Sequence, residues 1–290
     1  MKEFTIPASD GLLLSAAVFE HDDPKAIIQV VHGAKEHKER YYDFIQFLNN
    51  NGYAVIVSDN RGHGHSVNET YYLGHCDGVA QMLDDQYRVT QTIKAAYPGK
   101  DLYLFGHSFG SALARDYLQT HDDEIKKLLL TGTVFPIPVS RLGERLCDLS
   151  LMIGSPRSTK GLPALIANVP VDSWVCGNPA TMAVYRKDPL IQRCKYTTEA
   201  AETIIASVSM LRDYQYFRCK NPTLRILSAN GAGDPFMGGP VGLKMTVAAL
   251  RKVGYTLIDT IVYPGMKHEV INEVGNQTVY ADFLRFFDAE

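Results

Sequence analysis

Short apolar runs alternate with helical patterns along most of this chain of 290 residues. The runs are nearly continuous, whereas the helical patterns repeat their apolar residues every three or four positions. Parallel strands covered by helices on both faces have this appearance. We therefore expect an α/β fold with a mostly parallel sheet flanked by helices. The expected strands cover residues 12–19, 26–31, 53–59, 102–106, 126–132, 223–229 and 256–263, and the expected helices cover residues 39–50, 78–97, 109–120, 241–253 and 277–288.

The alternation breaks once, between residues 136 and 218, where prolines and glycines interrupt short apolar pieces. A structureless loop of this length is improbable in a compact domain, so we expect a helical cap insertion. The core then comprises residues 1–135 and 219–290. Because the insertion follows a strand of the sheet, we expect it over the carboxyl ends of the strands, where parallel sheets bind ligands.

Composition excludes some classes of protein. Hydrophobic residues make up 46% of the chain and charged residues 21%, as in ordinary globular enzymes. The formal net charge is −3, and lysines and arginines form no dense cluster, so we do not expect nucleic acid as a partner.

The five cysteines are scattered without a Cys-x-x-Cys pair, as is typical of reduced thiols. The first residues lack a basic start before an apolar run, so we expect no signal peptide and a cytoplasmic protein. His63, His65, His75 and Cys76 lie close in sequence, but the glycine turns between them do not bring ligands together, and we expect neither a metal nor a cofactor. The sequence does not indicate an oligomeric state.

A lone serine stands between two glycines in Gly106-His107-Ser108-Phe109-Gly110, between an expected strand and an expected helix. A side chain at either glycine would collide with neighbouring backbone if the serine were held in a strained conformation. In this setting the motif predicts a nucleophile elbow, with Ser108 as the nucleophile.

A serine nucleophile needs a histidine to take its proton and an acid to orient that histidine. His268 lies in the loop after the last expected strand, and Asp234 lies in a glycine-rich turn just beyond the preceding one. The chain order serine, acid, histidine is the one expected of this fold. Asp259 lies within an expected strand and is less suitable.

The developing oxyanion needs two donors. We expect one to be the backbone N–H of Phe109, directly after the nucleophile. The second is expected from the loop after an earlier strand, where Ala34 follows the His-Gly turn.

Five ordered blocks, "HGAKEHKERY", "DNRGHGHS", "GHSFG", "GAGD" and "KHEVINE", together resemble the monoacylglycerol lipase and lysophospholipase branch of the α/β-hydrolase superfamily. The resemblance implies an eight-stranded sheet and a serine hydrolase that cleaves monoacylglycerols, lysophospholipids or similar single-chain acyl esters through an acyl-enzyme. It implies Ser108, Asp234 and His268 as catalytic residues and the Ala34 and Phe109 amides as oxyanion donors.

One departure from the family pattern is Lys35, where many relatives carry glycine. A lysine beside the oxyanion loop could crowd the site or attract an anionic leaving group. In the insertion, we expect Leu149, Met152, Ile153 and Leu165 to contact the substrate's acyl chain, and the insertion to contact membrane or micelle surfaces transiently. Two alternatives stay open: an aminopeptidase-like serine hydrolase, and a non-enzymatic binding protein on the same scaffold.

Overall fold

The computed structural model describes residues 1–168, 170 and 172–289. Its sheet has eight strands in the order β1-β2-β4-β3-β5-β6-β7-β8. β1 and β2 run antiparallel to their neighbours, and the remaining strands are parallel. This arrangement confirms the predicted fold class. The strands are β1 (Lys2–Pro7), β2 (Leu13–Phe19), β3 (Ile27–Val31), β4 (Ala54–Ser58), β5 (Leu102–His107), β6 (Ile125–Thr131), β7 (Arg225–Gly231) and β8 (Ile258–Tyr263).

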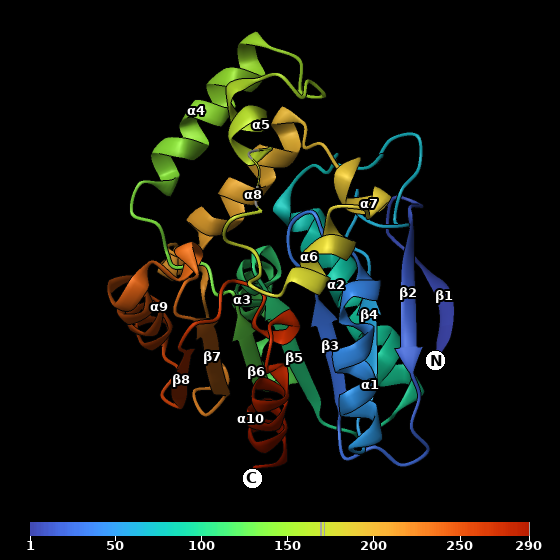
Figure 1. Ribbon diagram of the computed structural model, residues 1–290. Coiled ribbons are helices and arrows are strands. Elements are labelled where there is room, and N and C mark those ends of the chain that lie inside the picture. Colours follow the sequence, from blue (N-terminus) through green and yellow to red (C-terminus); the bar gives the residue numbers. More distant parts are fainter. Residues whose placement is uncertain (169, 171, 290) are drawn as a thin grey trace.

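Helices cover both faces of the sheet (Figure 1). Side chains alternate along each strand, so one strand feeds two cores. In β5, Leu102 and Leu104 join the core under α2, α3 and α9, whereas Phe105 joins the core under α1 and α10. These helices are α1 (Tyr42–Asn50), α2 (Val79–Ala96), α3 (Phe109–His121), α9 (Gly239–Val253) and α10 (Asn276–Asp288).

β1 was not among the strands expected from apolar runs. It is a short edge strand in which only Phe4 and Ile6 turn inward, so it lacks a continuous apolar run. Edge strands commonly carry polar residues because one side of their backbone faces solvent. The other strands agree with prediction to within a few residues at each end.

The helices of the insertion lie over the carboxyl ends of the strands (Figure 1). They are α4 (Ser140–Ile153), α5 (Leu162–Ala167), α6 (Pro179–Tyr185), α7 (Pro189–Gln192) and α8 (Thr198–Met210). We call residues 139–167 the outer segment and residues 172–197 the inner segment. The helical character agrees with expectation, and the division into a core and a separate cap domain stays a prediction.

In the described part of the chain, no helix is both long enough and apolar enough to cross a bilayer. Short 3-10 turns complete the fold. They cover Lys38–Tyr41, Asp122–Glu124, Tyr214–Tyr216, Pro235–Met237 and Val270–Asn272.

Candidate active site

Ser108 lies at the sharp turn between β5 and α3. Its φ is 54° and its ψ is −123°, and it is partly exposed. A Cβ at Gly106 would lie 2.6 Å from the carbonyl oxygen of Gly110, and a Cβ at Gly110 would lie 2.2 Å from that of Val31. Both glycines are therefore required by close backbone contacts, as the motif predicted.

Only two non-glycine residues among those described have positive φ, Ser108 and Lys35, each at 54°. This conformation costs a side-chain-bearing residue about 1 kcal/mol or more, because Cβ crowds the following carbonyl oxygen. Such strain persists where the surrounding structure enforces it, which is common at functional sites. Both residues stand next to a proposed oxyanion donor.

Asp234 and His268 come together at the carboxyl ends of β7 and β8. Nδ1 of His268 lies 2.9 Å from Oδ1 of Asp234. The same Asp234 oxygen accepts the backbone N–H of Phe236 at 2.8 Å, which fixes the carboxylate at the start of a short turn. Both side chains are buried.

The structure brings His268 close to the serine turn through residues of β6. The N–H of Ser108 donates to the carbonyl of Thr131 at 3.0 Å. The next residue, Gly132, is so near the histidine that a Cβ there would lie 2.7 Å from Cε1 of His268. The elbow and the histidine loop therefore meet at the end of β6.

The surroundings of His268 set its pKa. Burial alone would lower this pKa, but the Asp234 carboxylate, with Glu36 and Glu269 further away, raises it above the ordinary histidine value. The ring packs among three other aromatic rings, with centroid distances of 4.8 Å to His107, 5.2 Å to Trp174 and 5.4 Å to Phe236. A histidine held in this way can accept a proton without changing its orientation.

The two proposed oxyanion donors lie on facing loops. The loop after β3 approaches the nucleophile so closely that a Cβ at Gly33 would be 2.8 Å from Cβ of Ser108. Ala34 follows in that loop. Phe109 begins α3, and the first N–H groups of a helix have no partner within it and carry a partial positive charge. An oxyanion between these two amides would be stabilised.

Comparison with known proteins shows the family of this chain. A family profile described as serine aminopeptidase, S33, matches residues 22–275. The chain belongs to this hydrolase family. It is 24% identical over 261 residues to a monoacylglycerol lipase of Mycolicibacterium smegmatis, a match that spans 90% of this chain and 87% of that protein. It is 26% identical over 113 residues to a probable lysophospholipase L2 of Haemophilus influenzae, covering 39% of this chain and 36% of the relative.

Among solved structures, a highly thermostable carboxyl esterase from Bacillus coagulans in complex with glycerol superposes with a TM-score of 0.88. The superposition covers 99% of this chain and 97% of the esterase, at 23% identity, and shows a shared fold. The predicted resemblance to the monoacylglycerol lipase and lysophospholipase branch of the α/β-hydrolases is confirmed.

Sequence reasoning assigned no role to a buried polar network that supports the loop after β3, which carries the proposed oxyanion donor Ala34. Oε2 of Glu36 accepts the backbone N–H of Gly33 at 2.9 Å and the hydroxyl of Tyr41 at 2.5 Å. Arg40 donates to Glu269 at 2.5 Å and lies 3.9 Å from Glu36. The signal was present as Glu36 and Arg40 of "HGAKEHKERY", two opposite charges four residues apart.

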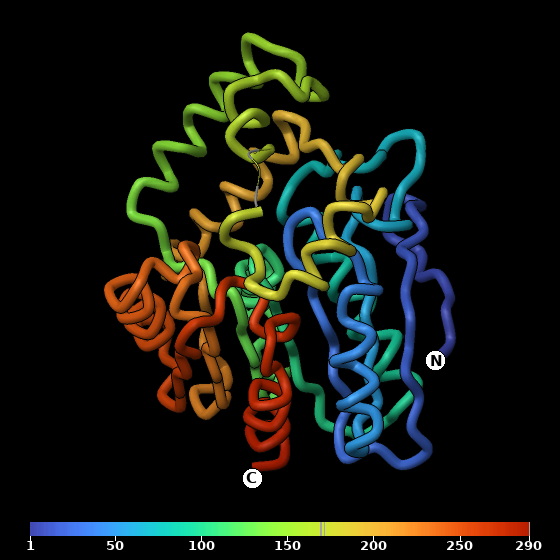
Figure 2. Tube along the Cα trace, viewed as in Figure 1, coloured from blue at the N-terminus to red at the C-terminus, as the bar shows by residue number. Residues whose placement is uncertain are grey.

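The inner segment forms one wall of the site. Its backbone reaches the histidine loop, with the N–H of Glu269 donating to Val175 at 2.9 Å and the N–H of Gly177 donating to Glu273 at 2.7 Å. Figure 2 shows the two pieces of chain, distant in sequence, passing side by side. The loop that carries His268 is thus held by the insertion as well as by the sheet.

The residues expected to contact the acyl chain lie in the outer segment and are exposed. The exposed fractions of Leu149, Met152, Ile153 and Leu165 are 53%, 83%, 81% and 55%. They are not enclosed in a tunnel, and their contact with a substrate stays a prediction.

Histidines that could have suggested a metal site have other partners. Nε2 of His63 contacts the hydroxyl of Tyr196 at 2.7 Å, and Nδ1 of His75 contacts the hydroxyl of Thr197 at 3.0 Å. Among the described residues, no group of three or more His, Cys, Asp or Glu side chains is arranged to hold a metal ion.

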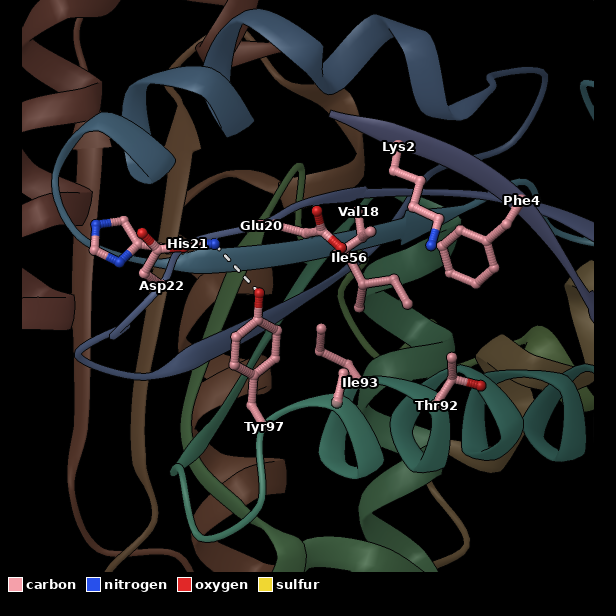
Figure 3. Close-up of a pocket in the computed structure, with 11 residues that line it drawn as sticks. Lys2, Phe4, Val18, Glu20, His21, Asp22, Ile56, Thr92, Ile93 and Tyr97 are labelled. Atoms are coloured by element: carbon pink, nitrogen blue, oxygen red, sulfur yellow. Dashed lines mark hydrogen bonds between the residues drawn. The ribbon is translucent and has the colours of Figure 1, made fainter.

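A hollow of about 390 Å³ lies far from this site, between the antiparallel strands and the end of α2 (Figure 3). It includes Lys2 and Phe4 of β1 and Tyr97, whose hydroxyl accepts the backbone N–H of His21 at 3.2 Å. Because Tyr97 precedes β5, the hollow is at the amino ends of the parallel strands. It contains none of the proposed catalytic residues.

Proposed function

We propose that this hydrolase cleaves carboxylic esters of single-chain fatty acids, such as monoacylglycerols and lysophospholipids, through an acyl-enzyme on Ser108. The proposal rests chiefly on one observation, the buried pair of Asp234 and His268 at 2.9 Å beside a strained serine turn. The similarity to a mycobacterial monoacylglycerol lipase and a probable Haemophilus lysophospholipase supports the substrate class.

In the first half of the reaction, His268 takes the hydroxyl proton of Ser108 while the serine oxygen attacks the ester carbonyl. The carbonyl oxygen becomes an oxyanion between the amides of Ala34 and Phe109. Loss of one such donor typically costs about 3 kcal/mol of transition-state stabilisation. His268 then gives its proton to the leaving alcohol, and the acyl group remains on the serine.

In the second half, a water molecule gives its proton to His268 and attacks the acyl-enzyme. Collapse of the second oxyanion releases the fatty acid, and the proton returns to Ser108. Asp234 stays ionised throughout. Its role is to hold the imidazole in the productive tautomer and to stabilise the positive charge that forms on it.

The family description would also suit hydrolysis at a peptide's free amino terminus. Recognition of an ammonium group calls for a carboxylate available to it, but Glu36 and Glu269 both lie within 4 Å of Arg40. A carboxylate paired with arginine has a much weaker attraction for a second cation. This observation favours esters over aminoacyl amides.

The outer segment supports action at a lipid surface. Leu142, Leu146, Leu149 and Ile153 recur at helical spacing along α4, and all four are at least half exposed. Residues 140–167 carry four basic and two acidic side chains. An apolar stripe beside a net positive charge suits the interface of an anionic membrane or micelle.

The nucleophile can be tested with a fluorophosphonate probe and a substrate panel. The probe should label the native protein, and Ser108→Ala should abolish both labelling and turnover of monoacylglycerols, lysophospholipids and aryl esters. Aminoacyl amides should not be cleaved. Labelling that persists in Ser108→Ala would contradict the nucleophile assignment, and a native protein that is folded but neither labelled nor active would favour a binding protein on this scaffold.

A further inference from the structure

Lys35 has an unusual position and an unusual backbone conformation beside the proposed oxyanion hole. It directly follows Ala34, and its φ of 54° is one that glycine adopts freely and lysine does not. A lysine at such a position is disfavoured by its own backbone. Glycine would avoid this strain, so the presence of lysine indicates a role for its side chain.

The backbone of Lys35 is fixed by the insertion. Its N–H donates to the hydroxyl of Tyr196 at 2.6 Å, and that hydroxyl also contacts Nε2 of His63 at 2.7 Å. Tyr196 is itself buried. The Lys35 ammonium lies 5.6 Å from the centre of the Tyr196 ring, so the side chain runs along this aromatic surface and is partly buried.

Other buried cations near the site have carboxylate partners. Lys38 lies 3.4 Å from Asp59, and Arg40 lies 2.5 Å from Glu269. In the part of the chain that the structure describes, the Lys35 ammonium has no carboxylate within 4.0 Å. A partly buried charge without a carboxylate partner is costly, and none of the described carboxylates is close enough to serve as its counter-ion.

The electrostatic surroundings of Lys35 confirm that the charge is not compensated. Burial lowers its pKa, and the positive charge of Lys195 lowers it further. The charged form of the Cys194 thiol would act in the opposite direction, but burial raises the pKa of Cys194 to about 12, so this thiol stays neutral at physiological pH. Lys195 therefore adds a second positive charge to the surroundings of Lys35.

We propose that Lys35 binds an anionic group of the substrate, a phosphate or carboxylate on the alcohol side of the scissile ester. This inference rests on the proposed ester hydrolysis. Consecutive Cα atoms are about 3.8 Å apart, so the lysine stem starts one residue from an oxyanion donor. A phosphate on the glycerol of a lysophospholipid is separated from the ester by a short carbon chain, and the flexible lysine stem suits such a group.

The test compares two substrates that differ only in the anion. These are a short-chain 1-acylglycerol and the corresponding 1-acylglycerol 3-phosphate, both below their aggregation concentrations. Lys35→Met keeps an unbranched aliphatic side chain and the same need for a positive φ, but it removes the positive charge. It should lower kcat/KM for the phosphate ester by roughly 10- to 100-fold more than for the neutral ester, as expected for one charge-assisted hydrogen bond.

Two further variants separate charge from structure. Lys126→Met removes an exposed charge at the amino end of β6 and should leave the ratio of the two kcat/KM values unchanged. Lys35→Gly relieves the backbone conformation and also removes the charge, so it should lose the same preference for the phosphate ester as Lys35→Met. If the Lys35 variants lower kcat/KM equally for both esters, the side chain has a structural role and the proposal is wrong.

Binding of glycerol 3-phosphate, measured by calorimetry, tests the anion site independently of turnover. The native protein should bind it at least 10-fold more tightly than Lys35→Met does. Equal binding would overturn the proposal. If inorganic phosphate alone competes as well as glycerol 3-phosphate, and the phosphate ester is cleaved no faster than the neutral one, the anion is not part of the substrate and the proposal is also wrong. Failure of both esters to react, with selective binding retained, would instead contradict the proposed ester hydrolysis.

Discussion

The inner and outer segments of the insertion have similar apolar content but different relations to the core. In the inner segment, Val175, Cys176, Met182, Tyr185 and Ile191 form a small buried cluster, and backbone hydrogen bonds join the segment to the histidine loop. In the outer segment, α4 packs along α8 and leaves an apolar stripe exposed. One segment is built into the site, whereas the other packs mainly on α8.

The difference shows that apolar residues outside the main core serve two physical purposes. Buried in the inner segment, they fix the wall that holds His268. Exposed in the outer segment, they remain available to an apolar partner, and exposed apolar patches of this kind commonly mark interaction sites. The comparison predicts that changes near the inner segment affect turnover of every ester, and that changes in the outer segment affect only aggregated substrates.

The largest effect is expected at the loops that the inner segment contacts. Asp234→Asn should lower kcat by roughly 10⁴-fold for soluble and aggregated esters alike, by analogy with the same substitution in serine proteases. Because Asp234 raises the pKa of His268, and only the neutral imidazole accepts the serine proton, the acidic limb of the native pH profile should lie above the ordinary histidine value of 6.5. In Asp234→Asn this acidic limb should move to lower pH, because the carboxylate that raises the pKa of His268 is gone.

The control for this variant is its fold, measured by circular dichroism and thermal unfolding. Near-normal turnover in a folded Asp234→Asn protein would mean that another acid orients His268. If Asp234→Asn lost turnover only with aggregated substrates, the proposed functional difference between the inner and outer segments would be wrong.

A smaller effect is expected in the outer segment. Leu149→Ser combined with Ile153→Ser should lower activity on emulsified long-chain esters about 10-fold, because less apolar surface enters the lipid phase. Activity on soluble short-chain aryl esters should not change. Leu257→Ser, at a leucine that is 47% exposed and precedes β8, is the matched control. A changed chain-length preference with soluble esters would instead support an acyl tunnel lined by these residues.

The smallest effect concerns the packing of α4 on α8. Burial, with the nearby charges of Asp148 and Glu144, raises the pKa of Glu202 to about 7. A carboxyl whose pKa is higher in the folded state stabilises the fold fully below its unfolded value near 4.5, and this contribution is lost as pH rises through 7. Glu202→Gln should therefore raise Tm by roughly 2–4 °C at pH 8 and have no such benefit at pH 4.5.

Exposed Glu69 offers a matched control for that substitution, since Glu69→Gln should not alter Tm in a pH-dependent way. An equal rise for Glu202→Gln at both pH values would show that its charge does not weaken the contact between α4 and α8.

Much of the fold could be predicted because parallel strands buried on both faces leave a strong apolar signal. β1 has no such apolar signal, because only one of its edges is paired and most of its side chains face solvent. The insertion was predicted as helical from its position and length. Its division into an enclosed and an exposed part was not, because the apolar pattern of a helix does not say whether a partner covers it.

The approach of Asp234 to His268 was predictable from chain order and from the rule that parallel strands end at one edge of the sheet. The glycines around Ser108 were informative because backbone contact leaves no room for Cβ. The support of Gly33 by Glu36, and the left-handed backbone of Lys35, could not be derived in this way. The conformation of Lys35 depends on a contact with Tyr196, which is distant in sequence, and Glu36 belongs to a network with Arg40 that includes the equally distant Glu269.

The edge-on contact of Trp174 with His268 has a practical consequence, because Trp174 is the only tryptophan in the chain. When tryptophan is excited selectively, all of the emission therefore comes from an indole beside the candidate catalytic histidine. A protonated imidazole quenches a neighbouring indole, so we expect emission intensity to follow the charge state of His268 in the resting protein. The molecule thus carries its own optical reporter, which allows the titration of one buried group to be followed without a substrate, a label or an added chromophore.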